Sequence, residues 1–143
     1  MKMIVALYLG FAAVLLWGAE SIAVVKSVKG SVQAKREGVY QAIKTGAFLE
    51  EGDIVLTGEN SSAGVSFSDG TLIALGPKSV FAVNKYRFRP ASGEYDFDVS
   101  MVRGNSLVET GKIGKLAPKK VRFNVPQGYI GIRGTKFIVS VEE

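Results

Sequence analysis

The sequence predicts an all-β fold: a β-solenoid-like stack of short strands with one β-hairpin, preceded by a cleavable helical signal peptide. There are 17 glycines among 143 residues, and valine, isoleucine, phenylalanine and tyrosine are common, which favours strands joined by tight turns. After residue 20, apolar and polar residues alternate with a period of two, and no stretch keeps the 3.6-residue period of a helix. A chain of this length predicts one domain.

Residues 1–19 have the pattern of a secretory signal peptide. A lysine near the start supplies a positive charge, an uncharged apolar run covers residues 4–17, and small residues follow it. The run is short for a membrane span, which needs roughly 20 apolar residues. No cysteine follows the run, so a lipoprotein anchor is excluded. Cleavage could follow Ala19 or Ala23, and only a retained leader would tether the protein to a membrane. In either case we expect residues 20–143 to lie in the periplasm.

The composition argues against catalysis. The sequence has no cysteine, which excludes disulfides and thiolate metal sites, and no histidine, the commonest general base and metal ligand. We therefore expect a protein that is not an enzyme and that holds no metal or cofactor. The net charge of +5 becomes +4 when Lys2 leaves with the leader (5 − 1 = 4). Such a charge suits either an anionic partner or simple solubility.

The first part of the mature sequence predicts short strands separated by turns. Residues 21–26 and 31–36 alternate as two strands hinged at Lys29-Gly30. An acidic, glycine-containing turn at 50–53 then leads into a strand at 54–57.

An eight-residue spacing marks residues 63–83. Small or apolar residues recur at this spacing in three successive triplets, separated by turns at 68–70 and 76–78. The triplets are Ala63, Val65 and Phe67; Thr71, Ile73 and Leu75; and Ser79, Phe81 and Val83. The regular spacing predicts three short strands with the same inward triplet, as in a β-solenoid. A β-meander would give a similar pattern.

Residues 85–98 predict a β-hairpin. Basic and aromatic residues alternate before the turn at 90–93, and acidic and aromatic residues alternate after it. Folding the chain at this turn predicts three pairs of opposite charge and two aromatic pairs: Arg89 with Glu94, Arg87 with Asp96, Lys85 with Asp98, Phe88 with Tyr95, and Tyr86 with Phe97. Each such pair contributes roughly 0.2–1 kcal/mol, and the aromatic face should pack on the core.

The last third predicts a glycine- and lysine-rich connection at 111–120. Strands are expected after it at 121–125, 129–132 and 135–141. No boundary in the sequence indicates a second domain.

Four segments of the mature sequence form a recognisable set. In chain order they are Val-Lys-Gly-Ser-Val at 28–32, Leu-Glu-Glu-Gly-Asp-Ile-Val-Leu-Thr-Gly at 49–58, Phe-Ser-Asp-Gly-Thr at 67–71 with Gly-Pro-Lys-Ser at 76–79, and Val-Pro-Gln-Gly-Tyr-Ile-Gly-Ile-Arg-Gly-Thr-Lys-Phe at 125–137. In this order they resemble the FecR-like domain family, named for the periplasmic part of the iron-citrate transmembrane regulator. The resemblance runs from about Val25 to the C-terminus. Val125 departs from it, because the family usually has threonine before this proline.

The resemblance implies a periplasmic, non-catalytic, β-rich domain similar to the solenoid-like sensor part of such regulators. Those regulators carry a cytoplasmic sigma-factor-binding segment before a membrane helix, and they extend beyond the last of the four segments. This sequence opens with a leader and stops at Glu143. We therefore expect a stand-alone FecR-like domain, and we do not expect it to control a sigma factor directly.

Arg133 is the first candidate binding residue, within Arg133-Gly134-Thr135. It could contact a partner or an anionic ligand, or it could clamp the last strand against the turn of Asp53 or Asp69. We expect the clamp, and we expect structural roles for a wider set of turn residues. That set is Gly30, Gly52, Asp53, Asp69, Gly70, Gly134 and Thr135.

Acidic residues give no convincing catalytic or metal site. Asp53 and Asp69 could act as a general acid and base only in a shared cleft, for which the sequence gives no sign. Glu94, Asp96 and Asp98 could attract Ca²⁺, but a calcium loop gathers its oxygens from a tightly turned segment and not from an extended strand.

The densest group of cations lies in the connection at 111–120 and the strand after it. Its members are Lys112, Lys115, Lys119, Lys120 and Arg122. They could bind an anionic polymer or an acidic protein surface, or they could simply solvate a loop. Single-stranded nucleic acid would need aromatic residues among the cations, and none occurs before Phe123. We expect no nucleic-acid partner.

Three hypotheses of function follow. The first is a periplasmic domain for protein interaction or signal relay, which binds an envelope protein through a strand edge or a loop. The second is a module that binds peptidoglycan or another glycan through the basic loop at 112–122 and exposed tyrosines such as Tyr40 and Tyr129. The third is a histidine-free hydrolase, which would need two carboxylates converging in a deep pocket.

Overall fold

The computed structural model describes residues 20–131 and 135–142, and these form twelve strands with three short helical segments. The expected signal peptide at 1–19 lies outside the described residues. The elements are β1 (Ser21–Lys29), β2 (Val32–Arg36), β3 (Val39–Ala42), β4 (Phe48–Glu50), β5 (Ile54–Thr57), β6 (Ser62–Phe67), β7 (Leu72–Leu75), β8 (Val80–Arg89), η2 (Pro90–Ser92), β9 (Glu94–Glu109), α2 (Lys112–Leu116), η3 (Pro118–Lys120), β10 (Val121–Val125), β11 (Gly128–Gly131) and β12 (Lys136–Val141).

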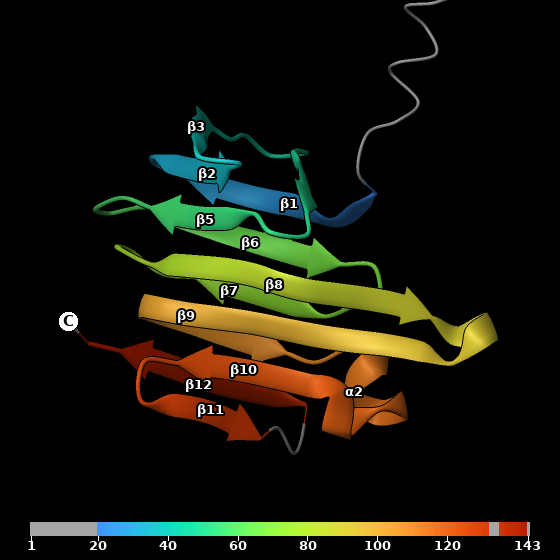
Figure 1. The fold of residues 1–143 in the computed structure, drawn as a ribbon. Helices are drawn as coiled ribbons and strands as arrows, with labels where there is room; N and C mark the ends of the chain where they lie inside the picture. Colours follow the sequence, from blue (N-terminus) through green and yellow to red (C-terminus); the bar gives the residue numbers. More distant parts are fainter. Residues whose placement is uncertain (1–19, 132–134, 143) are drawn as a thin grey trace, which may run out of the picture.

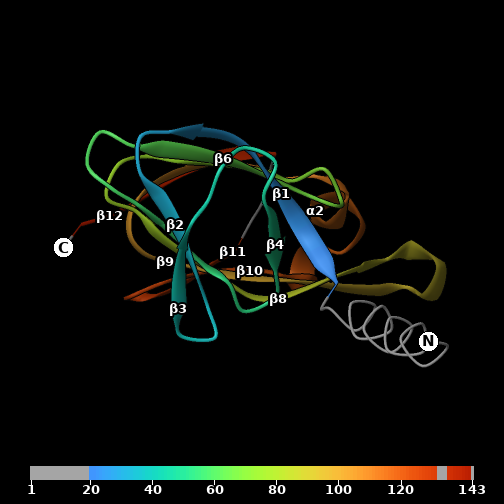
Figure 2. The same cartoon turned by 90° about the horizontal axis from the view of Figure 1, so that it is seen from above.

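The strands form one strongly curled sheet, shaped like a half-barrel, with two halves that face each other (Figures 1 and 2). The front half, as seen in Figure 1, has the order β3-β2-β5-β8-β9-β10-β11. The back half has the order β4-β1-β6-β7-β9, with β12 also paired to β9. The all-β prediction is confirmed.

The long strand β9 belongs to both halves. Its N-terminal part pairs with β8 and β10 in the front half, and its C-terminal part pairs with β7 and β12 in the back half. The change occurs at Gly104, which has a φ of +95°. A Cβ at this position would collide with Ser79, so glycine lets the strand bend close to its neighbour.

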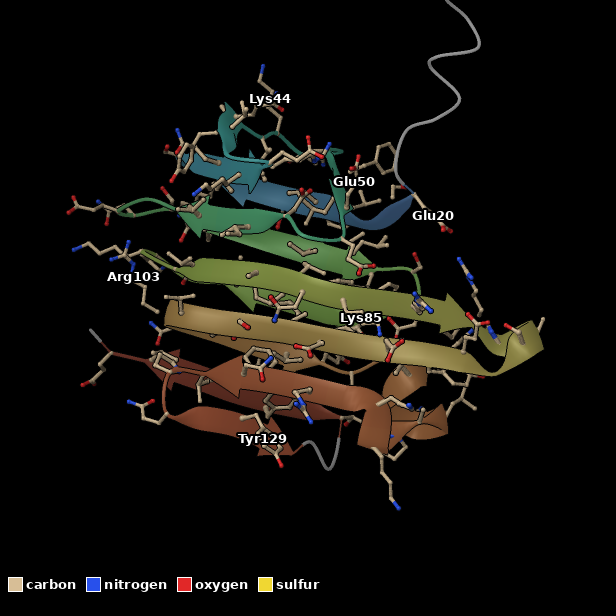
Figure 3. All side chains as sticks on the ribbon, viewed as in Figure 1. Glu20, Lys44, Glu50, Lys85, Arg103 and Tyr129 are labelled. Atoms are coloured by element: carbon tan, nitrogen blue, oxygen red, sulfur yellow. The ribbon has the colours of Figure 1, made fainter. Side chains whose placement is uncertain are left out.

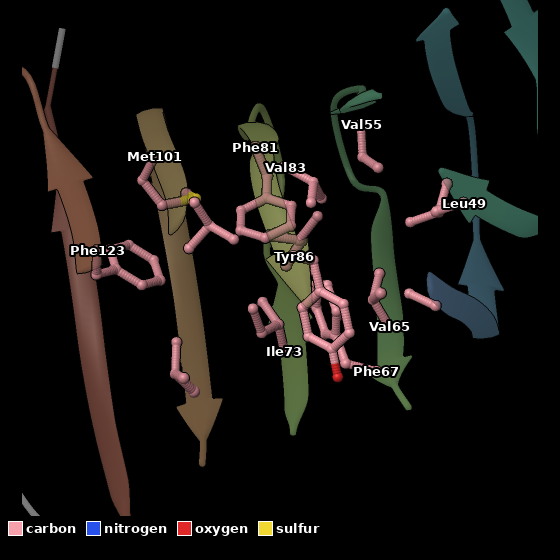
Figure 4. Close-up of a cluster of buried hydrophobic side chains, with 14 of the residues drawn as sticks. Leu49, Val55, Val65, Phe67, Ile73, Phe81, Val83, Tyr86, Met101 and Phe123 are labelled. Carbon is pink, nitrogen blue, oxygen red and sulfur yellow. The ribbon is translucent and has the colours of Figure 1, made fainter. Parts of the chain in front are cut away.

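The hydrophobic core fills the space between the two halves. Side chains from the front half, such as Phe81 and Met101, meet side chains from the back half, such as Val65 and Ile73 (Figure 4). All four are at most 1% exposed. Burial of this apolar surface, at roughly 25 cal/mol per Å², is the main force that holds the curled sheet together.

The eight-residue spacing identifies the inward positions correctly, but the solenoid inferred from it is wrong. All nine residues of the three triplets are buried. However, β6 and β7 pair in antiparallel orientation, with Val65 opposite Ile73, and β8 crosses to the other half to pair with β5 and β9. The physical reason is the turn at 68–70, where Gly70 has a φ of +92° and the chain reverses direction. In a β-solenoid, the chain would instead keep turning in the same direction from one strand to the next.

The hairpin at 85–98 is confirmed, including its register. All five expected pairs lie opposite one another in β8 and β9. The Tyr86 and Phe97 rings meet edge to face at 5.7 Å, and both pack on Phe67 in the back half. Two charge pairs differ, because the Lys85 ammonium contacts Asp96 at 3.6 Å instead of Asp98. Of the three expected ion pairs, the one that forms is Arg89 with Glu94, at 3.4 Å. The partners of Asp98 are neutral amides.

The bounds of the other expected strands agree with the observed bounds to within a few residues. Three further elements are not expected, because no pattern in the sequence predicts them. Strands β5 and β10 have the expected bounds, and β11 and β12 differ from expectation by one residue at the described ends. Neither β3 nor β4 is predicted by the alternation of apolar residues. The same holds for α2, which lies in the connection at 111–120 and buries Ile113 completely.

Candidate functional site

The cations between residues 112 and 122 lie on one exposed segment beside the curled sheet. Four of them are lysines on α2 and η3, and Arg122 is on the outer face of β10. All five side chains are exposed. Within the described ranges 20–131 and 135–142, no carboxylate lies within 4.0 Å of the four lysine ammonium groups. We call residues 112–122 the basic segment.

A buried aspartate holds the start of the basic segment against the sheet. Asp69 lies in the turn between β6 and β7 and is only 2% exposed. Its carboxylate accepts hydrogen bonds from the Tyr86 hydroxyl (2.9 Å), the Thr71 hydroxyl (2.8 Å) and backbone N–H (3.2 Å), and the Ile113 N–H (3.1 Å). The four donors come from three separate parts of the chain, so Asp69 joins the turn, β8 and α2.

Backbone contacts complete this junction. The Lys112 N–H donates to the Asp69 carbonyl at 2.9 Å, and the Gly111 N–H donates to the Thr71 hydroxyl at 3.0 Å. A Cβ at Gly111 would collide with the backbone of the turn at 69–71. Glycine is therefore required where the basic segment leaves the sheet.

Tyr86 carries the only large pKa shift among the described residues. Its hydroxyl is buried, and it both donates to Asp69 Oδ1 and accepts the Asp69 N–H at 2.9 Å. Burial raises the pKa of Tyr86 well above its ordinary value of 10.0, and the Asp69 carboxylate adds to this effect. The neutral phenol is thus part of the folded state.

This pKa shift predicts a loss of stability in alkali. Because the folded-state pKa of Tyr86 is raised, its contribution is complete below the unfolded pKa of about 10 and falls as the pH rises above it. We expect the free energy of unfolding to decrease more steeply between about pH 9 and 11 in the wild type than in Tyr86→Phe. Urea unfolding at each pH measures this, with Tyr40→Phe as the control at an exposed ring. Equal slopes in wild type and Tyr86→Phe would contradict the prediction.

A second buried carboxylate lies in the turn between β4 and β5. Asp53 is completely buried and forms a two-pronged contact with Arg36, with Nε at 2.9 Å from Oδ1 and Nη2 at 2.7 Å from Oδ2. The Asp53 carboxylate also accepts the Glu50 N–H at 2.9 Å. Hydrogen bonding to Asp53 raises the pKa of Arg36. This contact joins β2 to the turn before β5, and no feature of the sequence pattern indicates Arg36 as the partner.

The structure places the remaining candidate residues in turns or outside its described part. Arg133 and Gly134 lie outside the described residues. Thr135 is exposed, and its carbonyl accepts the Thr110 N–H at 2.8 Å. Gly30 and Gly52 have positive φ values of +76° and +94° in the turns before β2 and β5, as Gly70 does in the turn after β6. The carboxylates of Asp53 and Asp69 have no hydrogen-bond partner in common.

The outer face of the back half carries an exposed apolar patch that the sequence pattern does not reveal. Leu107 of β9 lies between Ala74 of β7 and Ile138 of β12, and Ile138 is 74% exposed. Leu72 is exposed on the same strand as Ala74. A shallow groove of about 300 Å³ runs between Ala74, Leu107 and Ile138. We call these four residues the apolar patch.

The apolar patch adjoins an open edge of the sheet. Among the described residues, β12 pairs with β9 alone, so its other edge carries no strand. Along β12, exposed and more buried residues alternate. An unpaired strand of this kind can accept a further strand through its backbone groups.

The described part of the chain contains neither a metal-binding cluster nor a membrane-spanning helix. No group of three or more histidine, cysteine, aspartate or glutamate residues in this part could hold a metal ion. No helix in the same part has the length and apolar character needed to cross a membrane.

The sequence profile of a family described as "FecR protein" matches residues 53–143, which is more than half of the chain. The match begins at the buried Asp53 and includes Asp69, the basic segment and the apolar patch. No curated protein and no solved structure matches the chain.

Proposed function

Because the chain belongs to the FecR family, we propose that it is a periplasmic domain that relays a signal by binding a protein partner at the cell envelope. The family consists of envelope-associated, non-enzymatic signalling regulators. A domain of this kind acts by changing its contacts, so the surface that meets the partner is the functional site.

The observation that carries the proposal is the apolar patch beside the open edge of β12. Clusters of exposed large apolar residues on soluble proteins often mark interaction sites. Here a partner strand added to β12 would satisfy its free backbone groups, and its side chains would pack beside Ile138. Backbone pairing would supply affinity, and a part of the partner that extends across β12 onto Leu107 and the groove beside Ala74 would supply selectivity.

The basic segment supports a second candidate function, the binding of anionic envelope polymers such as peptidoglycan. Its lysines are exposed and have no carboxylate partner among the described residues. Asp69 fixes the start of the segment, which reduces the entropy that an ordered complex must lose. Binding through these charges would weaken sharply with salt, because the screening length falls to about 3 Å at about 1 M ionic strength.

The protein-binding proposal is tested by crosslinking in intact cells. A photoreactive phenylalanine analogue is placed at Ile138 or, as the control, at Val102, which is also apolar and exposed but lies outside the apolar patch. We expect protein adducts from position 138 and far fewer from position 102. Burying an isoleucine contributes about 1.5–3 kcal/mol, so Ile138→Asp should weaken capture of the identified partner by about tenfold or more.

Two outcomes would contradict the proposal. The first is equal crosslinking from positions 138 and 102. The second is capture that disappears at about 1 M salt and yields only glycan adducts, which would favour the basic segment as the binding surface. Val102→Asp serves as the matched substitution, and it should leave capture unchanged.

A further inference from the structure

The outer face of the front half carries a cluster of polar side chains centred on Asp98. Asn84 of β8 donates from its amide nitrogen to Asp98 Oδ1 (3.1 Å) and to the Ser100 hydroxyl (2.7 Å). Asn124 of β10 donates to the same Asp98 oxygen (2.6 Å) and to the Val99 carbonyl (2.9 Å). Three neighbouring strands therefore converge on one carboxylate.

A β-bulge brings Asn84 into this cluster. The register between β8 and β9 shifts between Val83 and Lys85, so that Asn84 and Lys85 both point outward. Bulges re-aim side chains in this way and are common beside functional sites. Lys85 pairs with Asp96, which leaves neutral amides as the described partners of Asp98.

The cluster presents hydrogen-bond acceptors to solvent. The side-chain N–H groups of Asn84 and Asn124 already donate to Asp98, Ser100 and Val99. No described residue bonds to Asp98 Oδ2 or to the side-chain oxygens of the two asparagines. A ligand that fits this surface must bring several donors. Hydroxyl groups meet this need, because each can donate to a carboxylate or amide oxygen.

An aromatic ring lies beside these acceptors. Tyr129 of β11 is directly opposite Asn124 and is 66% exposed. The Arg122 guanidinium lies over the ring at 4.8 Å. Figure 3 shows Tyr129 and Lys85 on the same side of the sheet, so the ring and the polar cluster face the same solvent.

We propose that this face binds a pyranose glycan. A pyranose ring has hydroxyl donors around its rim and an apolar C–H face, which match the acceptors at Asp98 and the Tyr129 ring respectively. The surface is on the front half, and the apolar patch is on the back half, so this inference does not depend on the proposed protein contact.

The test is an NMR titration of the ¹⁵N-labelled protein with two tetrasaccharides. One is a tetramer of N-acetylglucosamine, which represents peptidoglycan-like sources, and the other is a tetramer of glucose, which represents other polysaccharides. At up to about 10 mM sugar, we expect the side-chain amide signals of Asn84 and Asn124 to shift with at least one of them. The sugar that binds more tightly identifies the source.

Three variants make the test specific. Asp98→Asn, which keeps the shape of the side chain, and Tyr129→Ala should each weaken binding by about tenfold or more. Tyr40→Ala is the matched control, because Tyr40 is also exposed and also lies under a cation, Lys35, but on the distant strand β3. The proposal is overturned if neither sugar shifts the two amides, if the only shifts are in residues 112–120, or if Tyr129→Ala binds as the wild type does.

Discussion

Asp69→Ala is expected to lower the free energy of unfolding by about 3–5 kcal/mol. The wild-type carboxylate accepts four hydrogen bonds in a site that is 2% exposed. Alanine would leave the Tyr86 hydroxyl and the Ile113 N–H buried without their partner. Each such unsatisfied group costs about 1–3 kcal/mol, and urea unfolding followed by circular dichroism measures the total.

The same substitution should release the basic segment. Ile113 and Lys112 are tied to Asp69 through its carboxylate and its carbonyl, and the carboxylate contact is the one that alanine removes. We expect trypsin to cleave after Lys112 and Lys115 much faster in Asp69→Ala, under conditions where the variant remains folded. Tyr86→Phe is the matched control, since it removes one of the four bonds to the carboxylate and the acceptor of the Asp69 N–H, and should cost about 1–2 kcal/mol. An Asp69→Ala protein as stable as Tyr86→Phe would show that Asp69 does not organise this junction.

The register of the hairpin is predictable from the sequence because its information is local. The turn at 90–93 sets the register, and alternation then determines which side chains meet across the ladder. The curvature of the sheet depends on longer-range information. The eight-residue spacing identifies which residues point inward. It does not show in which direction each strand runs or which half of the sheet it joins, because the turns at 68–70 and 76–78 determine both. Strand β3 is not predictable in this way because all four of its residues are exposed and give no apolar period.

The candidate site is predictable only in part, for a similar reason. Glycine-flanked aspartates in turns indicate a structural role for Asp53 and Asp69. Their partners are remote in sequence: Arg36 is 17 residues from Asp53, and Ile113 is 44 residues from Asp69. No local pattern links such residues. The apolar patch is hidden in the sequence because Leu107 and Ile138 each stand next to another apolar residue, Val108 and Val139, and the apolar pattern does not show which of the two points outward. Their exposure follows only from the arrangement of the two halves of the sheet.

Arg36→Ala is expected to lower the free energy of unfolding by about 2–4 kcal/mol, as measured by urea unfolding. Removing one partner of a buried ion pair leaves an uncompensated charge, and the cost reaches about 3–5 kcal/mol in fully buried pairs. The Arg36 side chain is 41% exposed, and water would reach part of the site, so a smaller value is expected here. Asp53 would keep only the Glu50 N–H as a described donor.

The matched control for Arg36 is Glu50→Gln. Glu50 contacts the same guanidinium at 3.0 Å but is partly exposed, so losing its charge should cost less than about 1 kcal/mol. Arg36→Lys distinguishes charge from geometry, because a lysine ammonium keeps the charge but cannot reproduce the two-pronged contact with Asp53. If geometry matters, Arg36→Lys should lose most of the stability that Arg36→Ala loses. Wild-type stability in Arg36→Lys would instead mean that the guanidinium acts on Asp53 as a simple positive charge, and that the hydrogen bonds joining β2 to the turn before β5 contribute little.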